Sequence, residues 1–278
     1  MEWHRLKNVI ILILLLLNGF LLVLVVGRRS EAAQYDRAAL ERTVEVLAGR
    51  GIEVDPDGLP GPGELPPLSL ERDLEAEQKL VRALLDESVE ADNRGGGLYL
   101  YRGALGEVSV RAGGELSAEL ADDPRWDAGS SPEDHAAALL KQMGVSARPL
   151  VSPAREGRTT VRFQQLWNKV PVFSCEVEFV YANGRLRAIQ GTLLTAGQGV
   201  EEEGGVLSLP TALMRFLDGV TATGDVCSSI RSMEAGYRIA SQPLSGGVRL
   251  TAVWLVSSNT ADYYLDGSTG ALTRLTGQ

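Results

Sequence analysis

A strongly apolar block lies near the start of the chain, at residues 9–26, and none of its 18 positions is charged. As an α-helix this block is about 27 Å long, close to the hydrocarbon thickness of a bilayer. The alternative is a cleaved signal peptide, whose apolar region is about 7–15 residues long and is followed by small residues. Because Arg28 and Arg29 occupy the stretch that leads to a cleavage site, we expect a retained transmembrane helix.

The next hundred residues alternate between helix-like and strand-like patterns. Apolar positions at helical spacing predict helices, and short β-rich runs bounded by glycine predict strands. Residues 55–67 contain five prolines and three glycines and predict a loop. We therefore expect an N-terminal α+β subdomain over residues 31–125, with helices at 35–50 and 70–89, strands at 52–54, 98–103 and 106–113, and a loop at 92–97.

The second half repeats one arrangement, in which a helix opened by Ser and Pro is followed by an antiparallel meander. The polar residues 122–131 mark the boundary before it. We expect a C-terminal α+β subdomain over 131–278, made of two repeats, 131–195 and 206–276. The expected helices are 131–144 and 208–219, and the expected strands are 159–168, 170–181, 185–194, 236–242, 248–256, 262–266 and 271–275. The fold class is α+β; a β-sandwich is the alternative, disfavoured by four helical segments.

The strand at 170–181 has the clearest two-sided pattern. Five apolar or aromatic side chains share one face, and three polar ones point the other way, which is typical of a half-buried antiparallel strand. Asn183-Gly184 follows it and predicts a tight hairpin. The apolar face consists of Phe173, Cys175, Val177, Phe179 and Tyr181, and the polar face of Ser174, Glu176 and Glu178.

Charge narrows the range of partners. After residue 30 the chain has 23 basic and 35 acidic residues, a net charge of −12. Such an acidic body is a poor match for nucleic acid, whose affinity comes largely from Lys and Arg on phosphates. It also disfavours adsorption to anionic lipid. We therefore expect no nucleic-acid partner, and a membrane attachment by insertion.

Residues suited to catalysis or metal binding are few. The two histidines, His4 and His135, have no partner pattern, and the known nucleophile, zinc and phosphate-loop motifs do not occur. Glu176 and Glu178 are about 6–7 Å apart on one strand face, a spacing found in glycosidases, but acids on a solvated strand are common. We expect no enzyme activity, no catalytic residues, no cofactor and no metal site.

The two cysteines, Cys175 and Cys227, lie 52 positions apart without a metal-like spacing. Outside the cytoplasm they could form a disulfide. Two separate small buried residues are the equal alternative, and neither cysteine has a histidine partner that would make it a nucleophile.

Asn18 and Gly19 stand in the middle of the apolar block. A carboxamide in hydrocarbon is costly unless it is hydrogen-bonded, and such groups tend to bond across helix–helix contacts. A small neighbour lets another backbone approach. Asn18 and Gly19 are therefore candidates for contact with a partner in the membrane, against the alternative of an isolated Asn in a very hydrophobic helix.

Two stretches are similar to known families. EWHRLKNVIILILLLLN (2–18) resembles the opening of YycI proteins. FQQLWNKVPVFSCEVEFVYANGRLRAIQGTL (163–193) and YYLDGSTGAL (263–272) resemble the PepSY and fungalysin/thermolysin-propeptide pattern, although Lys169 replaces a usual Gly.

The YycI resemblance implies a regulator without catalytic residues. Its partners would be a YycH-like protein and the WalK/YycG-like sensor histidine kinase of the cell-wall two-component system. It further implies a single-pass protein with a cytoplasmic tail, residues 1–8, and an extracytoplasmic body. The propeptide resemblance alone implies another function, a protease-inhibiting or chaperoning module at the cell surface.

Overall fold

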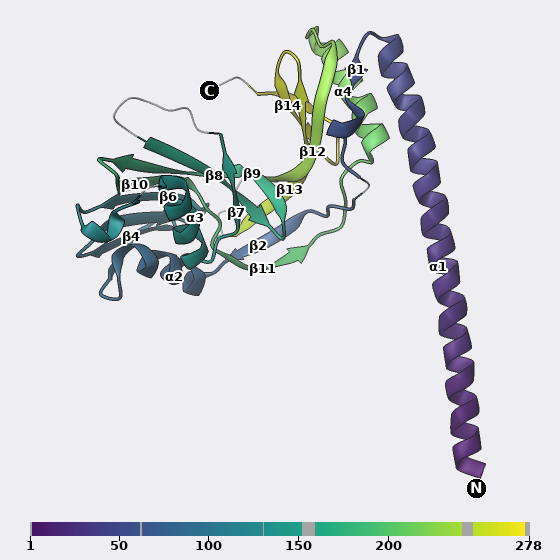
Figure 1. The fold of residues 1–278 in the computed structure, drawn as a ribbon, viewed down its shortest axis with the longest axis horizontal. Coiled ribbons are helices and arrows are strands. Elements are labelled where there is room, and N and C mark those ends of the chain that lie inside the picture. Colours follow the sequence, from purple (N-terminus) through teal and green to yellow (C-terminus); the bar gives the residue numbers. More distant parts are fainter. Residues whose placement is uncertain (1, 62, 130, 152–158, 241–246, 276–278) are drawn as a thin grey trace.

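The structure is a computed structural model of the chain that describes residues 2–61, 63–129, 131–151, 159–240 and 247–275. The side chains of residues 2–6, 9, 12, 21–34 and 196 are outside this description. The fold is mixed α+β, as expected, with four α-helices and 15 strands among the described residues. A long N-terminal helix stands away from a two-lobed body (Figure 1).

The N-terminal helix α1 extends without a break over 48 residues, Glu2–Gly49. The apolar block 9–26 and the expected helix 35–50 are therefore parts of one helix. Among the residues that the structure describes, no helix combines the length and the hydropathy needed to cross a membrane. Residues 9, 12 and 21–26 of the block have side chains outside the description, and the transmembrane helix stays a prediction.

The larger lobe is an antiparallel sheet covered on one face by two helices, α2 (Leu74–Leu85) and α3 (Pro132–Gln142). Their apolar faces pack on inward side chains of the strands, among them Tyr101, Phe163 and Phe179. The strands are β3 (Glu90–Gly95), β4 (Leu98–Gly103), β5 (Gly106–Arg111), β6 (Glu115–Leu120), β7 (Ala147–Leu150), β8 (Thr159–Trp167), β9 (Val170–Ala182) and β10 (Arg185–Thr192).

The C-terminal lobe packs the helix α4 (Leu209–Thr223) on a smaller sheet. Its core includes Phe216 and Tyr263, whose rings meet edge to face at 5.5 Å. The last turns of α1 belong to this core through Leu47. The strands are β1 (Glu53–Val54), β12 (Ser229–Ile239), β13 (Val248–Ser258), β14 (Asp262–Asp266) and β15 (Leu272–Arg274).

The lobes join into one continuous sheet where β9 meets β12 in parallel at the pair Val172–Tyr237. The strand β2 (Leu68–Arg72) extends the sheet of the C-terminal lobe, where it lies between β13 and β11 (Ala196–Glu201). A third core cluster, which includes Leu70 and Leu250, fills the junction. Among the described strands, only β1–β12 and β9–β12 are parallel pairs; the sheet is otherwise antiparallel.

The division into lobes does not follow the expected boundary at 122–131. β6 of the expected N-terminal subdomain pairs with β10 of the first expected repeat, and both contribute to one core. The second expected repeat, 206–276, contributes α4 and β12 to β15 to the C-terminal lobe, which also contains β1 and the last turns of α1. The packing thus separates the two repeats from each other more than it separates residues 31–125 from residues 131–195.

Several expected elements have different bounds in the structure. The helix expected over 70–89 begins only at Leu74, because Asp73 caps it by accepting hydrogen bonds from the amides of Glu75 and Ala76. Residues 70–72 belong instead to β2, which buries Leu68 and Leu70 in alternation. The loop expected at 92–97 is mostly the strand β3. The strand expected at 236–242 begins earlier, at Ser229.

The expected end of the fourth helix at Gly219 is wrong. The helix continues to Thr223 and ends at Gly224, whose φ of 72° places it in the left-handed region that favours glycine. Gly219 has a packing reason instead. A Cβ at this position would lie 2.8 Å from the Cβ of Leu272, so only glycine allows α4 to approach β15 this closely.

The β8–β9 hairpin turn carries an unusual residue. Asn168 and Lys169 both have positive φ, 48° and 70°, as a two-residue type I′ turn requires. Asn tolerates this conformation, but for Lys it costs about 1 kcal/mol or more. We expect Lys169→Gly to raise the free energy of unfolding by about 1 kcal/mol, measured by urea denaturation of the full chain in mild detergent. Lys169→Ala is the control: an equal gain there would assign the effect to the lost charge.

Candidate functional site

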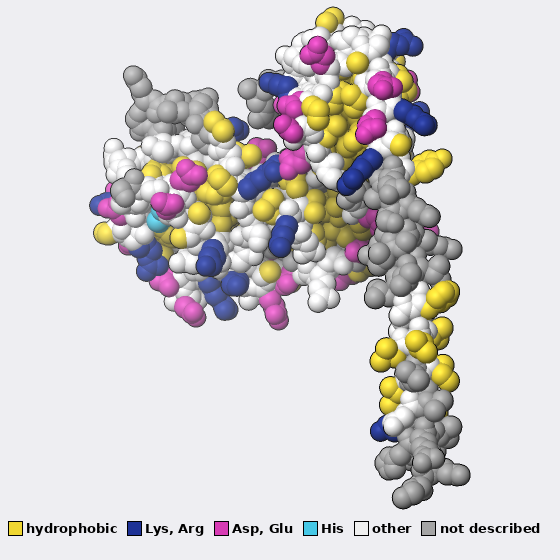
Figure 2. All heavy atoms as spheres, turned by 45° about the vertical axis from the view of Figure 1, so that its right-hand side comes forward, with side chains coloured by type: hydrophobic (Ala, Val, Ile, Leu, Met, Phe, Trp, Pro, Cys, Tyr) yellow, Lys and Arg dark blue, Asp and Glu magenta, His cyan; other side chains and the backbone are white. Residues whose placement is uncertain are grey.

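The exposed surface of α1 is the part of the described chain best suited to contact a partner. Figure 2 shows hydrophobic side chains exposed on the visible face of the protruding helix. Phe20 and Leu15 are 63% and 67% exposed. The other large apolar side chains in this segment that are exposed are Ile10, Ile11, Ile13, Leu14, Leu16 and Leu17.

The two contact candidates, Asn18 and Gly19, lie within this exposed segment. No heavy atom comes within 4 Å of the position that a Cβ of Gly19 would occupy. The backbone is therefore open to close approach by another helix. The structure places both residues where a partner could reach them, and their contact with one stays a prediction.

The other end of α1 is fixed to the C-terminal lobe. Leu47 is fully buried and packs with residues of α4, and Thr43 is only 8% exposed. The chain then enters the sheet within three residues: the amide of Ile52 donates to the carbonyl of Leu47 (2.9 Å), and that of Glu53 donates to the carbonyl of Ser228 (2.9 Å). α1 and the lobe therefore form one packed unit.

The one histidine whose side chain the structure describes, His135, lies against a tyrosine hydroxyl. The side chain of His4 lies outside the described residues. The Nδ1 atom of His135 is 2.9 Å from the Tyr181 hydroxyl. Burial raises the pKa of Tyr181 and lowers that of His135, so a neutral hydroxyl and a neutral imidazole share this hydrogen bond. His135 thus connects α3 to β9 in the core of the larger lobe.

The partly buried position of His135 has a consequence for stability at mild acid pH. In the unfolded chain histidine titrates near pH 6.5, whereas burial lowers the pKa in the fold despite the opposing charge of Asp127. Because the unfolded state then binds more protons, the free energy of unfolding falls as pH drops below about 6.5. We expect the wild type to lose more stability than His135→Gln between pH 7.5 and 5.5, measured by urea denaturation. Parallel curves for the two proteins would contradict this.

The acidic pair of the polar strand face lies opposite a carboxamide and a guanidinium of β8. Glu176 is exposed opposite Gln164, and Glu178 is half-buried opposite Arg162. Among the described residues, no group of three His, Cys, Asp or Glu side chains is placed to hold a metal ion. The expectation that the chain is not an enzyme stays a prediction.

The two cysteines are free thiols in different parts of the molecule. Cys175 is buried in the core at the junction of the lobes, and the partly buried Cys227 packs against the core of the C-terminal lobe. Burial raises the pKa of Cys175 to about 12 and also raises that of Cys227, so both are poor nucleophiles. A disulfide between them stays a prediction.

A buried ion pair that the sequence did not reveal connects β2, α2 and β4. Glu77 is fully buried, and its two oxygens accept hydrogen bonds from the Arg72 guanidinium at 2.7 and 2.8 Å. The Tyr101 hydroxyl donates to Glu77 at 2.7 Å, and Arg72 lies over the ring of Tyr99 at 4.6 Å. All polar atoms of this cluster face protein partners, which makes it structural.

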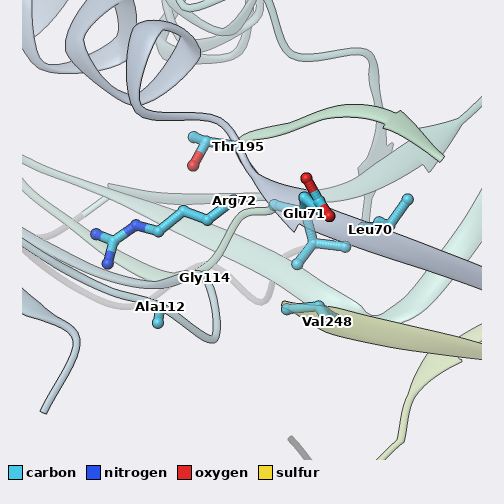
Figure 3. Close-up of a pocket in the computed structure, with 8 residues that line it drawn as sticks. Leu70, Glu71, Arg72, Ala112, Gly114, Thr195 and Val248 are labelled. Carbon is cyan, nitrogen blue, oxygen red and sulfur yellow. The ribbon is translucent and has the colours of Figure 1, made fainter. Parts of the chain in front are cut away.

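The pocket next to this ion pair is too small for a metabolite (Figure 3). Its volume of about 10 Å³ is close to the room that one water molecule needs. It lies where β2 meets the turn at Gly114, and it is lined by Leu70, Glu71, Arg72, Ala112, Gly114, Leu194, Thr195 and Val248.

A second polar cluster that the sequence did not reveal crosses between the lobes. Arg148 of β7 makes a bidentate ion pair with Glu234 of β12, at 2.5 and 2.8 Å. The same guanidinium donates to the side-chain carbonyl of Gln164 at 2.6 Å. Since Arg148 and Glu234 are 86 positions apart, no local pattern could have indicated this contact.

Comparison with known proteins yields structural neighbours only. No family model matches the chain, and no curated protein matches it. An uncharacterized protein from Eubacterium rectale superposes with a TM-score of 0.48 and 11% identity, over 81% of this chain and 90% of that one. The YpeB C-terminal domain of Bacillus megaterium superposes with a TM-score of 0.39 and 13% identity, over 75% of this chain and 100% of that one. Similarities of this size establish neither family nor function.

Proposed function

We propose that the chain is a membrane-anchored extracytoplasmic regulator of a WalK/YycG-like sensor histidine kinase. It would be a single-pass protein of the cell membrane with residues 1–8 in the cytoplasm. It would act by protein–protein contacts, together with a YycH-like protein, through α1 and the folded body. The resemblance of residues 2–18 to YycI proteins names this partner.

The observation that carries the proposal is the exposed apolar segment of α1, with Asn18 and Gly19 at its centre and no covering element in the described chain. An exposed apolar surface of this extent marks a contact with lipid or protein.

The test compares kinase activity with and without the full chain. The kinase and the YycH-like protein from the same genome are co-expressed with it in membranes, and kinase autophosphorylation is measured. We expect the rate to change when the chain is present. An unchanged rate removes the proposal, and inhibition of an extracellular metalloprotease by the same protein would support the propeptide-like alternative.

Asn18 is expected to contribute to the contact. A carboxamide bonded across two helices in a membrane contributes about 1–2 kcal/mol, so Asn18→Leu is expected to lower co-purification of the kinase about 5- to 30-fold. Phe20→Leu is the matched control, because it changes an exposed apolar neighbour without removing a hydrogen-bonding group. Equal losses for both variants would contradict a specific role of Asn18.

A further inference from the structure

We propose that α1 holds Asn18 in a fixed rotational phase relative to the C-terminal lobe, so that this lobe and the kinase contact lie on one side of the helix. This inference rests on the proposed function and adds how the contact is regulated: the orientation of the lobe sets the face that α1 presents in the membrane.

The helix α1 is continuous from the apolar segment to the lobe. α1 extends from Glu2 to Gly49 without interruption, and no linker separates the apolar segment from the docked turns. A continuous helix resists torsion, whereas a flexible tether transmits none. Rotation of the lobe about the helix axis therefore turns Asn18 with it.

The C-terminal end of α1 is firmly attached to the lobe. Leu47 is fully buried, Thr43 is nearly so, and Leu40 is partly buried against the same core. These three positions recur at helical spacing and define the docked face of α1. Beyond it, only three residues separate the helix from β1, whose Glu53 pairs with Ser229 of β12. The helix has no loop at this end in which it could turn freely.

Asn18 and Leu47 lie at nearly the same angle around the axis of α1. At about 100° per residue, the 29 positions from Asn18 to Leu47 correspond to eight full turns plus about 20°. Asn18 therefore lies on the docked face, together with Ile11 at about 0° and Leu15 at about 40° from Leu47. Phe20 lies about 180° away, on the opposite face. The polar residue of the apolar segment is thus in line with the contact to the lobe, about 44 Å along the axis.

This alignment places a helix bonded to Asn18 beneath the C-terminal lobe. In Figure 1 the lobe, with α4 and β12, stands on one side of the upper end of α1. A kinase helix on the same side would have its own extracytoplasmic part next to this lobe. The contact at Asn18 would then depend on the position of the lobe. A partner that binds the folded body and moves the lobe would change this contact.

The experiment inserts alanines between Asp36 and Arg37, two exposed positions of α1, in the full chain co-expressed with the kinase in membranes. Two alanines turn Asn18 by about 200° and move it by about 3 Å. Seven alanines turn it by about 700°, which is 20° short of two turns, and move it by about 10 Å. The two insertions separate the effect of rotation from the effect of distance. The shorter insertion moves Asn18 less along the axis but leaves it on the opposite face, whereas the longer one moves it further and returns it to nearly the same face.

We expect the two-residue insertion to reduce the effect on kinase autophosphorylation about tenfold, the size of a typical coupling between sites, and the seven-residue insertion to retain it within about twofold. Equal activity of both insertions, or a greater loss with seven, overturns the inference and leaves the proposed function intact. If the unmodified chain does not affect the kinase, the proposed function itself fails. Amide exchange of the β12 and β13 strands in each variant verifies that the lobe remains folded.

Discussion

Glu77→Ala is expected to lower the free energy of unfolding of the larger lobe by about 3–5 kcal/mol, the cost of removing one partner from a buried ion pair. The Glu77 side chain is fully buried, and that of Arg72 is 13% exposed. Without the carboxylate, the Arg72 guanidinium keeps its hydrogen bond to the Gly97 carbonyl, at 3.0 Å, and its contact with the Tyr99 ring, but it loses its counter-ion. The Tyr101 hydroxyl loses its acceptor. Urea denaturation of the full chain in mild detergent measures the change.

The matched control is an ion pair of the same lobe that lies in solvent. Arg102 and Glu107 are 2.7 Å apart with half-exposed side chains, and exposed pairs contribute about 0–1 kcal/mol. Glu107→Ala is therefore expected to change stability by less than about 1 kcal/mol. Equal effects of the two substitutions would show that the Arg72–Glu77 pair is hydrated in solution.

Local signals were sufficient to predict the elements that they specify. Ser131 caps α3 by accepting from the amide of Asp134 at 3.1 Å, as its position before Pro132 indicates. Asn183 and Gly184 adopt positive φ in the β9–β10 turn, which the dipeptide itself requires. In such segments the sequence pattern and the tertiary fold favour the same conformation, so the local pattern is enough to predict the cap and the turn.

Edge strands were missed because their own residues do not favour a strand. β3 has the sequence EADNRG, which is exposed throughout and contains no apolar alternation beyond Ala91. It is a strand because β4 provides a ladder for it, with Asp92 opposite Leu100. β11, with two glycines in six residues, likewise exists through its pairing with β2. Pairing of this kind depends on neighbours that no local window contains.

The candidate site divides in the same way. The apolar segment and Asn18 within it follow from the order of residues alone. Its relation to the body does not, because the burial of Leu47 against α4 brings together positions more than 160 apart in the chain. The polar contacts of Arg72 with Glu77 and of Arg148 with Glu234 also depend on strand order, which a single sequence does not reveal.

Leu47→Ala is expected to cost about 2–5 kcal/mol, the range for removing most of a buried leucine side chain and leaving a cavity. The loss falls on the C-terminal lobe, because Leu47 packs in its core. Since the two lobes have separate cores, a global denaturation curve can mix their transitions. Native-state amide exchange of β12 and β13, compared with that of β5 and β6, measures the lobes individually. We expect faster exchange in the C-terminal lobe and little change in the larger one.

Val46→Ala provides the control, because this neighbouring side chain is 45% exposed and its loss should cost well under 1 kcal/mol. The pair of variants also separates anchoring from coupling. Leu47→Ala leaves the apolar segment intact, so under the proposed function the protein should stay in the membrane fraction, while the loosened attachment of α1 should weaken the proposed effect on the kinase. If Leu47→Ala speeds exchange in the lobe but leaves the kinase response unchanged, α1 acts as a tether, and the fixed phase between Asn18 and the lobe has no regulatory role.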